Sequence, residues 1–383
     1  MQLRRWDPCF QNLAIYGYFS GAQRLPAPDE TNIFIESYKH GWFWHIPLHT
    51  GWMSVGAVVD SRTGQEGIRR HGLERFWRHQ MALAPHTAQM LRQAQLVSGP
   101  EVVKDWSYIS DQVVGDGYIL VGDAACFVDP LFSSGVHLAC MSGVLAAAYV
   151  TTALKDPSMQ EAAGRVYQEL YYKEYNHFRA MTQLFYASNR TVDSYFWEAR
   201  QLLGEEDTLS PRHAFIHAVA GQPPRGYERV VLERGAAPTT FVESVRRVET
   251  ERAARQAQLA AARTPAASPS AVLLQAVPRL ASGVVLQRKP IIAAGEFVWG
   301  DVLVTTGYPE GLPCSRLVAW MVSHIDGQGS VAELLARLCG EGEAKQQQQL
   351  AAGLLTALEI LYVDGTIVYE GLAERHPHAA PCR

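Results

Sequence analysis

Apolar and polar positions alternate in four short runs within the first 60 residues. Glycine-containing turns separate the runs, which cover residues 12–19, 32–38, 42–48 and 52–59. A period of two predicts β-strands, and the short turns between them predict an antiparallel meander.

The third run contains the sequence WFWHIP. Trp42, Trp44 and Ile46 share one face of this strand, and Phe43 and His45 share the other, because side chains alternate between the faces. Both faces are bulky, so we expect this strand to be central and covered on both sides.

A strand, a loop and a helix are predicted in the segment VGDAACFVDPLFSSGVHLACMSGV. Residues 64–97 before it favour helix and residues 101–110 favour strand. The apolar run 118–121 ends at Gly122 and Asp123, as expected for a buried strand that stops at a turn. From Val136 no proline occurs until Pro157, which predicts a helix of about five turns.

A second helical segment is predicted from residue 158 to about 203. One of its sides carries aromatic residues at helical spacing, namely Tyr167, Tyr171, Tyr175, Phe178 and Phe185. Such a stripe is typical of a core, although it could also wall a pocket for a flat substrate.

The last third of the chain has a different character. Residues 236–272 favour a charged helix followed by a Pro- and Ser-containing linker. Beyond them the pattern predicts a small α+β domain with strands at 282–290, 301–306 and 365–371 and helices at 315–325, 330–338 and 345–361. We expect a winged-helix-like packing or lid domain rather than a DNA reader, because Lys345 is the only cation between Ala344 and Asp364.

Composition indicates a globular protein without an obvious polyanionic partner. The 383 residues are 48% hydrophobic and 19% charged, with a net charge of -4. These values favour neither nucleic acid nor an anionic membrane as partner. The six cysteines form no C-x-x-C pair, so we predict reduced thiols, no metal site and a cytoplasmic location.

The loop before the predicted helix at Val136 offers chemistry as well as structure. Pro130, Ser133, Ser134 and Gly135 lie near a helix start, where backbone N–H groups lack intrahelical partners and attract anions. Alternatively, Ser133 or Ser134 only caps the helix. Asp123 and Asp129 have an ordinary reading too, since turns favour aspartate.

Two segments together resemble flavin-dependent halogenases of the tryptophan-halogenase superfamily. WFWHIP matches the W-x-W-x-I-P signature of that family, and GDAACFVDPLFSSGVHLA resembles its GD motif and flavin-contacting loop. The sequence DPLFSSG is similar to the branch that acts on phenols or pyrroles, since the tryptophan-specific branch has glutamate in place of Phe132. The resemblance covers residues 1 to about 235.

This resemblance implies a partial FAD-dependent monooxygenase-like α/β (α+β) fold with an antiparallel substrate sheet. It implies that reduced FAD from a separate flavin reductase, with oxygen, oxidises chloride or bromide to hypohalous acid, which travels through a tunnel to an electron-rich aromatic. That substrate would be a phenol or pyrrole, free or bound to a carrier protein, in secondary-metabolite biosynthesis. The implied site residues are Gly122, Asp123, Ala124, Asp129 and Pro130 for FAD, Ser133, Ser134 and Gly135 for halide, and Trp42, Trp44, Ile46 and Pro47 for the tunnel.

Two features of the family do not occur in the sequence. There is no G-x-G-x-x-G motif for the ADP half of FAD, and none of the six lysines matches the family's catalytic lysine, so the catalytic residue is unknown. We therefore expect that the N-terminal third of a halogenase is lacking, and that this chain alone binds FAD weakly and has no halogenating activity. The predicted divisions are a partial FAD-binding domain at 1–235, a helical linker at 236–272, the winged-helix-like domain at 273–372 and a tail at 373–383.

Two other functions remain open from the sequence. One is an FAD-dependent monooxygenase or oxidoreductase of the same broad class, which would share the GD step without the tryptophan signature. The other is an inactive fragment that serves as an interaction protein.

Overall fold

A computed structural model describes residues 2–104, 106–188, 250–260, 271–305, 308–339 and 344–370. Most of the predicted helical linker at 236–272 and the helical prediction beyond residue 188 therefore lie outside the described residues. The chain divides into two compact units, the first containing Met1–Ala146 and Tyr171–Ala218, the second containing Ala147–Leu170 and Val242–Arg383. The predicted domain limits remain a prediction.

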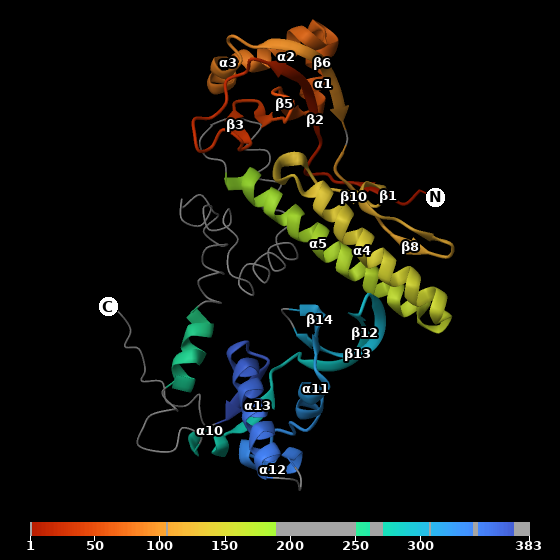
Figure 1. The fold of residues 1–383 in the computed structure, drawn as a ribbon, viewed down its shortest axis with the longest axis vertical. Coiled ribbons are helices and arrows are strands. Elements are labelled where there is room, and N and C mark those ends of the chain that lie inside the picture. The colour runs from red at the N-terminus through yellow and green to blue at the C-terminus, as the bar shows by residue number, and fades with distance from the viewer. Residues whose placement is uncertain are drawn as a thin grey trace. The chain divides into compact units, whose positions relative to one another are not determined.

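A five-stranded antiparallel sheet dominates the first unit (Figure 1). Its strands are β2 (Asn12–Ser20), β3 (Phe34–Tyr38), β4 (Gly41–Pro47), β5 (Met53–Asp60) and β6 (Gln95–Lys104). The spatial order is β3-β4-β5-β2-β6. The predicted strands are all present. The predicted antiparallel meander is confirmed for β3, β4 and β5 and is wrong for β2, which pairs with β5 and β6 instead of β3.

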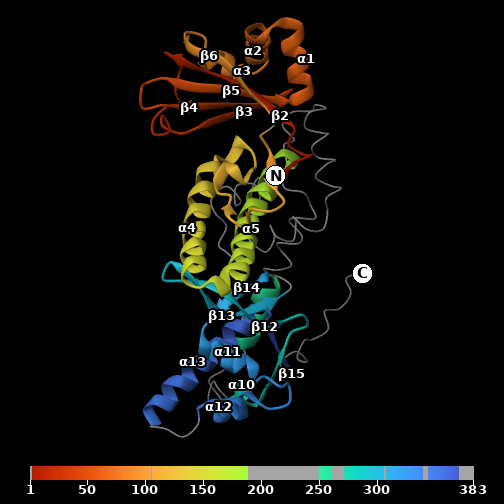
Figure 2. The same ribbon diagram turned by 90° about the vertical axis from the view of Figure 1, so that its right-hand side faces the viewer.

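Three short helices cover one face of this sheet (Figure 2). They are α1 (Ser61–His71), α2 (Leu73–Ala82) and α3 (Pro85–Met90). Helix was predicted for residues 64–97, and the last three of these residues belong to β6 instead. Phe43, Val55 and Trp77 are among the fully buried residues between the sheet and the helices.

The opposite face of the sheet carries a second core. Trp42 lies here together with Ala14, Val58 and Leu131. Trp42 is 1% exposed and Phe43 is 0% exposed, although they point to opposite faces. The prediction of a central strand covered on both sides is therefore confirmed.

Small strands and turns connect the sheet to the long helices. β1 (Arg4–Trp6), β7 (Tyr108–Ser110) and β10 (Cys126–Phe127) form a three-stranded sheet, and β8 (Val114–Gly115) pairs with β9 (Tyr118–Ile119). The run 118–121 was predicted as a buried strand, and this is wrong. Only two of its residues are in a strand, and they are half-buried in a hairpin because β8 is their only pairing partner among the described strands.

Two long helices lie side by side in both views (Figures 1 and 2). They are α4 (Ser134–Lys155) and α5 (Gln160–Ser188), joined through the 3-10 turn Pro157–Met159. The aromatic stripe of α5 is core, since Tyr167, Tyr171 and Tyr175 are at most 2% exposed. By length and composition α4 could cross a membrane, but this is weak evidence, because a core helix of a soluble protein passes the same test.

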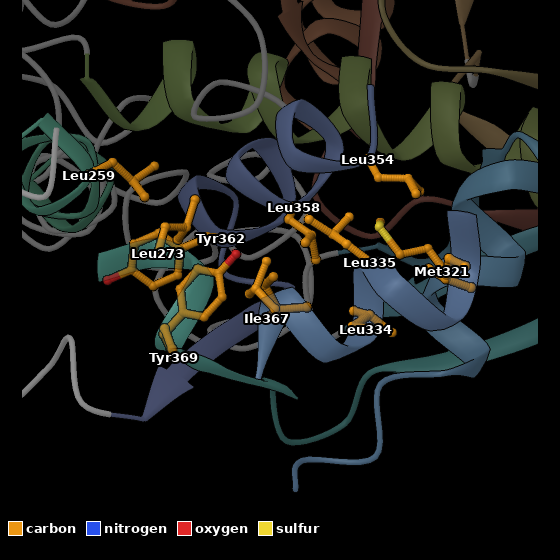
Figure 3. Packing of buried hydrophobic residues seen from close by; sticks show 13 residues of the cluster. Leu259, Leu273, Met321, Leu334, Leu335, Leu354, Leu358, Tyr362, Ile367 and Tyr369 are labelled. Carbon is orange, nitrogen blue, oxygen red and sulfur yellow. The ribbon is translucent and has the colours of Figure 1, made fainter. Parts of the chain in front are cut away.

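The second unit has its own hydrophobic core (Figure 3). Residues 250–260 are helical. They are followed by α10 (Ala271–Gln275), β11 (Val277–Leu280), β12 (Val285–Ala293), β13 (Glu296–Thr305), β14 (Tyr308–Cys314), α11 (Arg316–Ser323), α12 (Val331–Cys339), α13 (Ala344–Val363) and β15 (Ile367–Glu370). Leu354, Leu358 and Ile367 are 0% exposed at the centre of this core.

The C-terminal elements agree in part with the winged-helix-like prediction. The three helices and the last strand are present, whereas β11 and β14 were not predicted. The last strand, β15, pairs antiparallel with β11, which precedes the helices. β12, β13 and β14 form a separate meander. Phe297 of β13 contacts α4, because its backbone N–H donates to the Thr152 hydroxyl and its carbonyl accepts from the same hydroxyl.

Candidate functional site

The start of α4 is preceded by two consecutive tight turns. Asp129 caps the 3-10 turn Pro130–Phe132 by accepting a hydrogen bond from the Leu131 N–H at 3.0 Å. Ser133 follows in the left-handed region with φ 51°, and its N–H donates to the Pro130 carbonyl at 3.0 Å. A right-handed turn followed by a left-handed residue forms a concave nest of backbone N–H groups.

The N–H groups available to an anion at this point can be specified. The Ser133 N–H is already used by Pro130. Ser134 and Gly135 are the first two residues of α4, where N–H groups have no intrahelical acceptor. A β-carbon on Gly135 would lie 2.9 Å from the Phe127 ring, so this close approach requires glycine.

The tryptophans of β4 form the facing wall. The Trp42 and Trp44 rings lie 6.0 Å apart on one face of the strand. The Trp44 indole N–H donates to the Ser54 hydroxyl at 3.2 Å. The same indole lies across Gly56 of β5, where a β-carbon would be 2.1 Å from the ring, so glycine is needed for this position too.

A cavity of about 450 Å³ lies between these two walls. Six of the predicted site residues line it, namely Trp42, Trp44, Ile46, Pro130, Ser133 and Gly135. The cavity does not include Pro47, Gly122, Asp123, Ala124, Asp129 or Ser134 among its lining residues. The W-x-W-x-I-P strand and the DPLFSSG loop, about 85 residues apart in the chain, thus enclose one space.

Gly122 of the GD motif contacts α4 beyond its first turn. The Gly122 N–H donates to the Ser142 hydroxyl at 3.0 Å, and the Gly122 carbonyl accepts from the Tyr171 hydroxyl at 2.9 Å. Gly122 has φ 58°, and a β-carbon there would lie 3.1 Å from that of Ala139. At 1.5 Å per residue, Ala139 and Ser142 are about 8 and 12 Å along the helix from Ser134.

Asp123 and Asp129 are in different environments. Asp123 is exposed, in the 3-10 turn Gly122–Ala124. Asp129 is 1% exposed, and its carboxylate accepts from the Leu131 N–H and, at 3.4 Å, from the Tyr186 hydroxyl. Its observed contacts are those of a turn cap.

The cavity wall formed by the described residues is aromatic and carries no full charge. Among these described lining residues the only ionisable side chains are Tyr16 and Tyr18. The Tyr16 hydroxyl donates to Glu101 at 2.8 Å. This hydrogen bond and burial raise the pKa of Tyr16, which keeps the phenol neutral.

The motif histidine lies on the other face of the sheet. His45 is 1% exposed, and its Nε2 lies 2.9 Å from the Thr87 hydroxyl. That hydroxyl donates its single hydrogen to Glu36 at 2.7 Å, so the His45 Nε2 must carry a hydrogen and act as donor. Burial lowers the pKa of His45 to about 4, and the ring is therefore neutral at pH 7.

Several lining residues were not predicted as site residues. They include Tyr16 and Tyr18 of β2, Ser54 of β5, and Trp106, Phe127 and Leu131. The two-residue spacing of Tyr16 and Tyr18 is a signal for one shared face, but only the pairing of β2 beside β5 brings that face to Trp44. None of the lining residues is a lysine, and a catalytic lysine remains unassigned.

These residues fit the flavin end of FAD. A flat ring system requires an apolar cavity, and the glycines at 122 and 135 permit close approach to α4. An extended ligand could contact both the helix start and the exposed Asp123, because the turn Gly122–Ala124 lies against α4 at Ala139 and Ser142. The described residues contain no cluster of three or more His, Cys, Asp or Glu side chains that could hold a metal ion.

Known proteins share this fold. The structure of CmlS, a flavin-dependent halogenase, superposes with a TM-score of 0.61 at 21% identity, covering 96% of this chain and 65% of that one. The chain therefore has the FAD-dependent monooxygenase-like fold of the flavin-dependent halogenases, and the predicted fold class is confirmed. The tryptophan halogenase family model matches residues 9–265, and the chain belongs to this family.

Curated relatives agree with this family. A tryptophan 2-halogenase of Chondromyces crocatus is 35% identical over 207 residues, which are 54% of this chain and 40% of the relative. The flavin-dependent halogenase ptaM of Pestalotiopsis fici is 36% identical over 168 residues, 42% of this chain and 31% of the relative. The chain thus spans less than half the length of these relatives.

Proposed function

We propose that this chain provides the halide and aromatic-ring side of a flavin-dependent halogenase. The observation that carries the proposal is the cavity shared by the tryptophan wall of β4 and the turn that precedes α4. The reaction would use reduced FAD, oxygen and chloride or bromide. A separate flavin reductase would supply the reduced flavin.

Each wall has a distinct task in this proposal. The N–H groups of Ser134 and Gly135 would hold the halide, since oriented donors at a helix start bind an anion without a competing full positive charge. Pro130 would contact the flavin edge, and Gly122, Asp123 and Ala124 its ribityl or phosphate region. When bound, reduced FAD would supply with oxygen the oxidising equivalents that convert halide to hypohalous acid.

Asp129 has a different role in this proposal from the one expected of it. It would hold the turn at Pro130, because its carboxylate accepts from the Leu131 N–H and from the Tyr186 hydroxyl. Ser133 would shape the nest through its left-handed backbone. Trp42, Trp44 and Ile46 would exclude water from the space through which hypohalous acid passes, with Pro47 ending the strand.

The substrate would be an electron-rich aromatic without a carboxylate near the ring. The lining residues offer aromatic faces and hydroxyls but no cation, and burying an unpaired carboxylate costs far more than burying a neutral ring. This supports a phenol or pyrrole, free or carrier-bound, over a free amino acid. Phe132 packs edge-on against Phe185 at 6.0 Å, which leaves this position apolar.

A reconstituted reaction tests the proposal. A form of the protein that also carries the family's G-x-G-x-x-G and lysine segment would be incubated with FAD, a flavin reductase, bromide and either a simple phenol or indole-3-acetate as a carboxylate-bearing control. We expect brominated phenol, identified by its isotope doublet in mass spectrometry, and its loss when Gly135 is replaced by valine. A product that contains added oxygen but no halogen would favour a monooxygenase instead.

A further inference from the structure

The Tyr186 hydroxyl lies where three segments of the first unit meet. It accepts the Trp42 indole N–H at 2.7 Å and the Asn12 side-chain N–H at 3.3 Å. Its own hydrogen points to Asp129 Oδ2 at 3.4 Å. A phenol hydroxyl both donates and accepts hydrogen bonds, so one atom can serve all three contacts.

These contacts join the two walls of the cavity. Trp42 belongs to the β4 wall, and Trp42 and Tyr186 are each 1% exposed. Asp129 Oδ1 accepts the Leu131 N–H and thereby shapes the turn that ends at Ser133. Because these side chains are buried, water cannot readily replace the hydrogen bonds between them. The positions of Trp42 and Asp129 relative to Tyr186 are therefore fixed.

We propose that Tyr186 is a positioning residue that sets the distance between the tryptophan wall and the turn before α4. It acts through Trp42 on one side and through Asp129 on the other, and it is not itself among the cavity-lining residues. The consequence for halogenation rests on the proposed function. The contacts themselves do not, so the experiment reads the walls directly without flavin or halide.

The test is Tyr186→Phe in the full chain, which keeps the ring and its contact with Phe10 at 5.7 Å. The Trp42 indole signal would be assigned among the nine tryptophans by its loss in Trp42→Phe. In Tyr186→Phe we expect this signal to move upfield as the N–H loses its acceptor. Amide exchange in the peptide 128–136 should become about tenfold faster, as for loss of one buried hydrogen bond.

Two controls separate positioning from general loosening. Tyr175→Phe removes another buried hydroxyl from α5 and should change neither readout. Peptides of α1–α3, on the other face of the sheet, should exchange as in the wild type. If they accelerate equally, Tyr186 is only structural and the proposal is wrong.

A second variant keeps the proposal falsifiable if Tyr186→Phe does not fold. Asp129→Asn alters the hydrogen bond between residue 129 and the Tyr186 hydroxyl. The Trp42 indole signal should then shift as well, because the Trp42 N–H donates to that same hydroxyl. An unchanged Trp42 signal in Asp129→Asn would overturn the proposal. So would a shifted Trp42 signal in Tyr186→Phe with unchanged exchange in the peptide 128–136.

Discussion

Mild acid should destabilise the five-stranded sheet through His45. The buried imidazole has a pKa of about 4 in the folded chain against 6.5 when unfolded. Because the unfolded chain binds the proton more readily, the stability contribution is complete above pH 6.5 and is lost as the pH falls towards 4. Linkage gives a loss of about 2 kcal/mol at pH 5 and about 3 kcal/mol at pH 4.

The matched variant is His45→Gln, whose amide can donate to the Thr87 hydroxyl as Nε2 does but does not titrate. Protein equilibrated in urea at each pH would be pulse-labelled with deuterium at one fixed pH. Peptides covering residues 34–60 then report unfolding of the sheet alone. We expect the wild-type midpoint to fall more than that of His45→Gln between pH 7 and 5. Parallel curves for the two proteins would refute the reasoning, because the other titrating groups are common to both.

Three further predictions concern the site and its support. Gly56→Ala should push the Trp44 indole off β5, because the new methyl would lie 2.1 Å from the ring, and a crystal structure with Trp44 unmoved would contradict this. Arg179→Met should cost about 3 to 5 kcal/mol in urea unfolding, since it leaves the 4% exposed Asp7 carboxylate without its guanidinium, whereas Asp7→Leu combined with Arg179→Met should cost much less. Riboflavin and FAD should bind this chain with affinities that differ by less than about tenfold, or about 1.4 kcal/mol, because the assigned residues contact the flavin end. Fluorescence titrations that show much tighter binding of FAD would point to an ADP site in the chain.

Local patterns predicted the elements of the first unit better than their arrangement. Alternation found β2 to β5 because each has one face in a core. It could not place β2 between β5 and β6, since pairing partners are a property of the whole sheet. β6 was partly assigned to helix because its exposed, edge-strand composition, interrupted by Gly99 and Pro100, lacks the apolar alternation of a half-buried strand.

The site shows the same division. Trp42, Trp44 and the helix start were recognisable from short motifs, and these lie at the cavity. Tyr16 and Tyr18 were not, because their role depends on β2 pairing with β5, 40 residues away. Asp129 caps the turn at Pro130, and its predicted contact with the cofactor stays a prediction, because a sequence containing Asp-Pro cannot distinguish a cap from a ligand.

The two-residue period also determines how the W-x-W-x-I-P strand can be studied. Trp42, Trp44 and Ile46 line the cavity, whereas Phe43 and His45 lie on the face that packs against α1–α3. Trp42 is exceptional because it belongs to a hydrophobic core as well as to the cavity wall. Loss of activity on replacing Trp42 would therefore mix destabilisation with a damaged site. Trp44 and Ile46, which are only half-buried, are the positions where a change in activity can be attributed to the cavity itself.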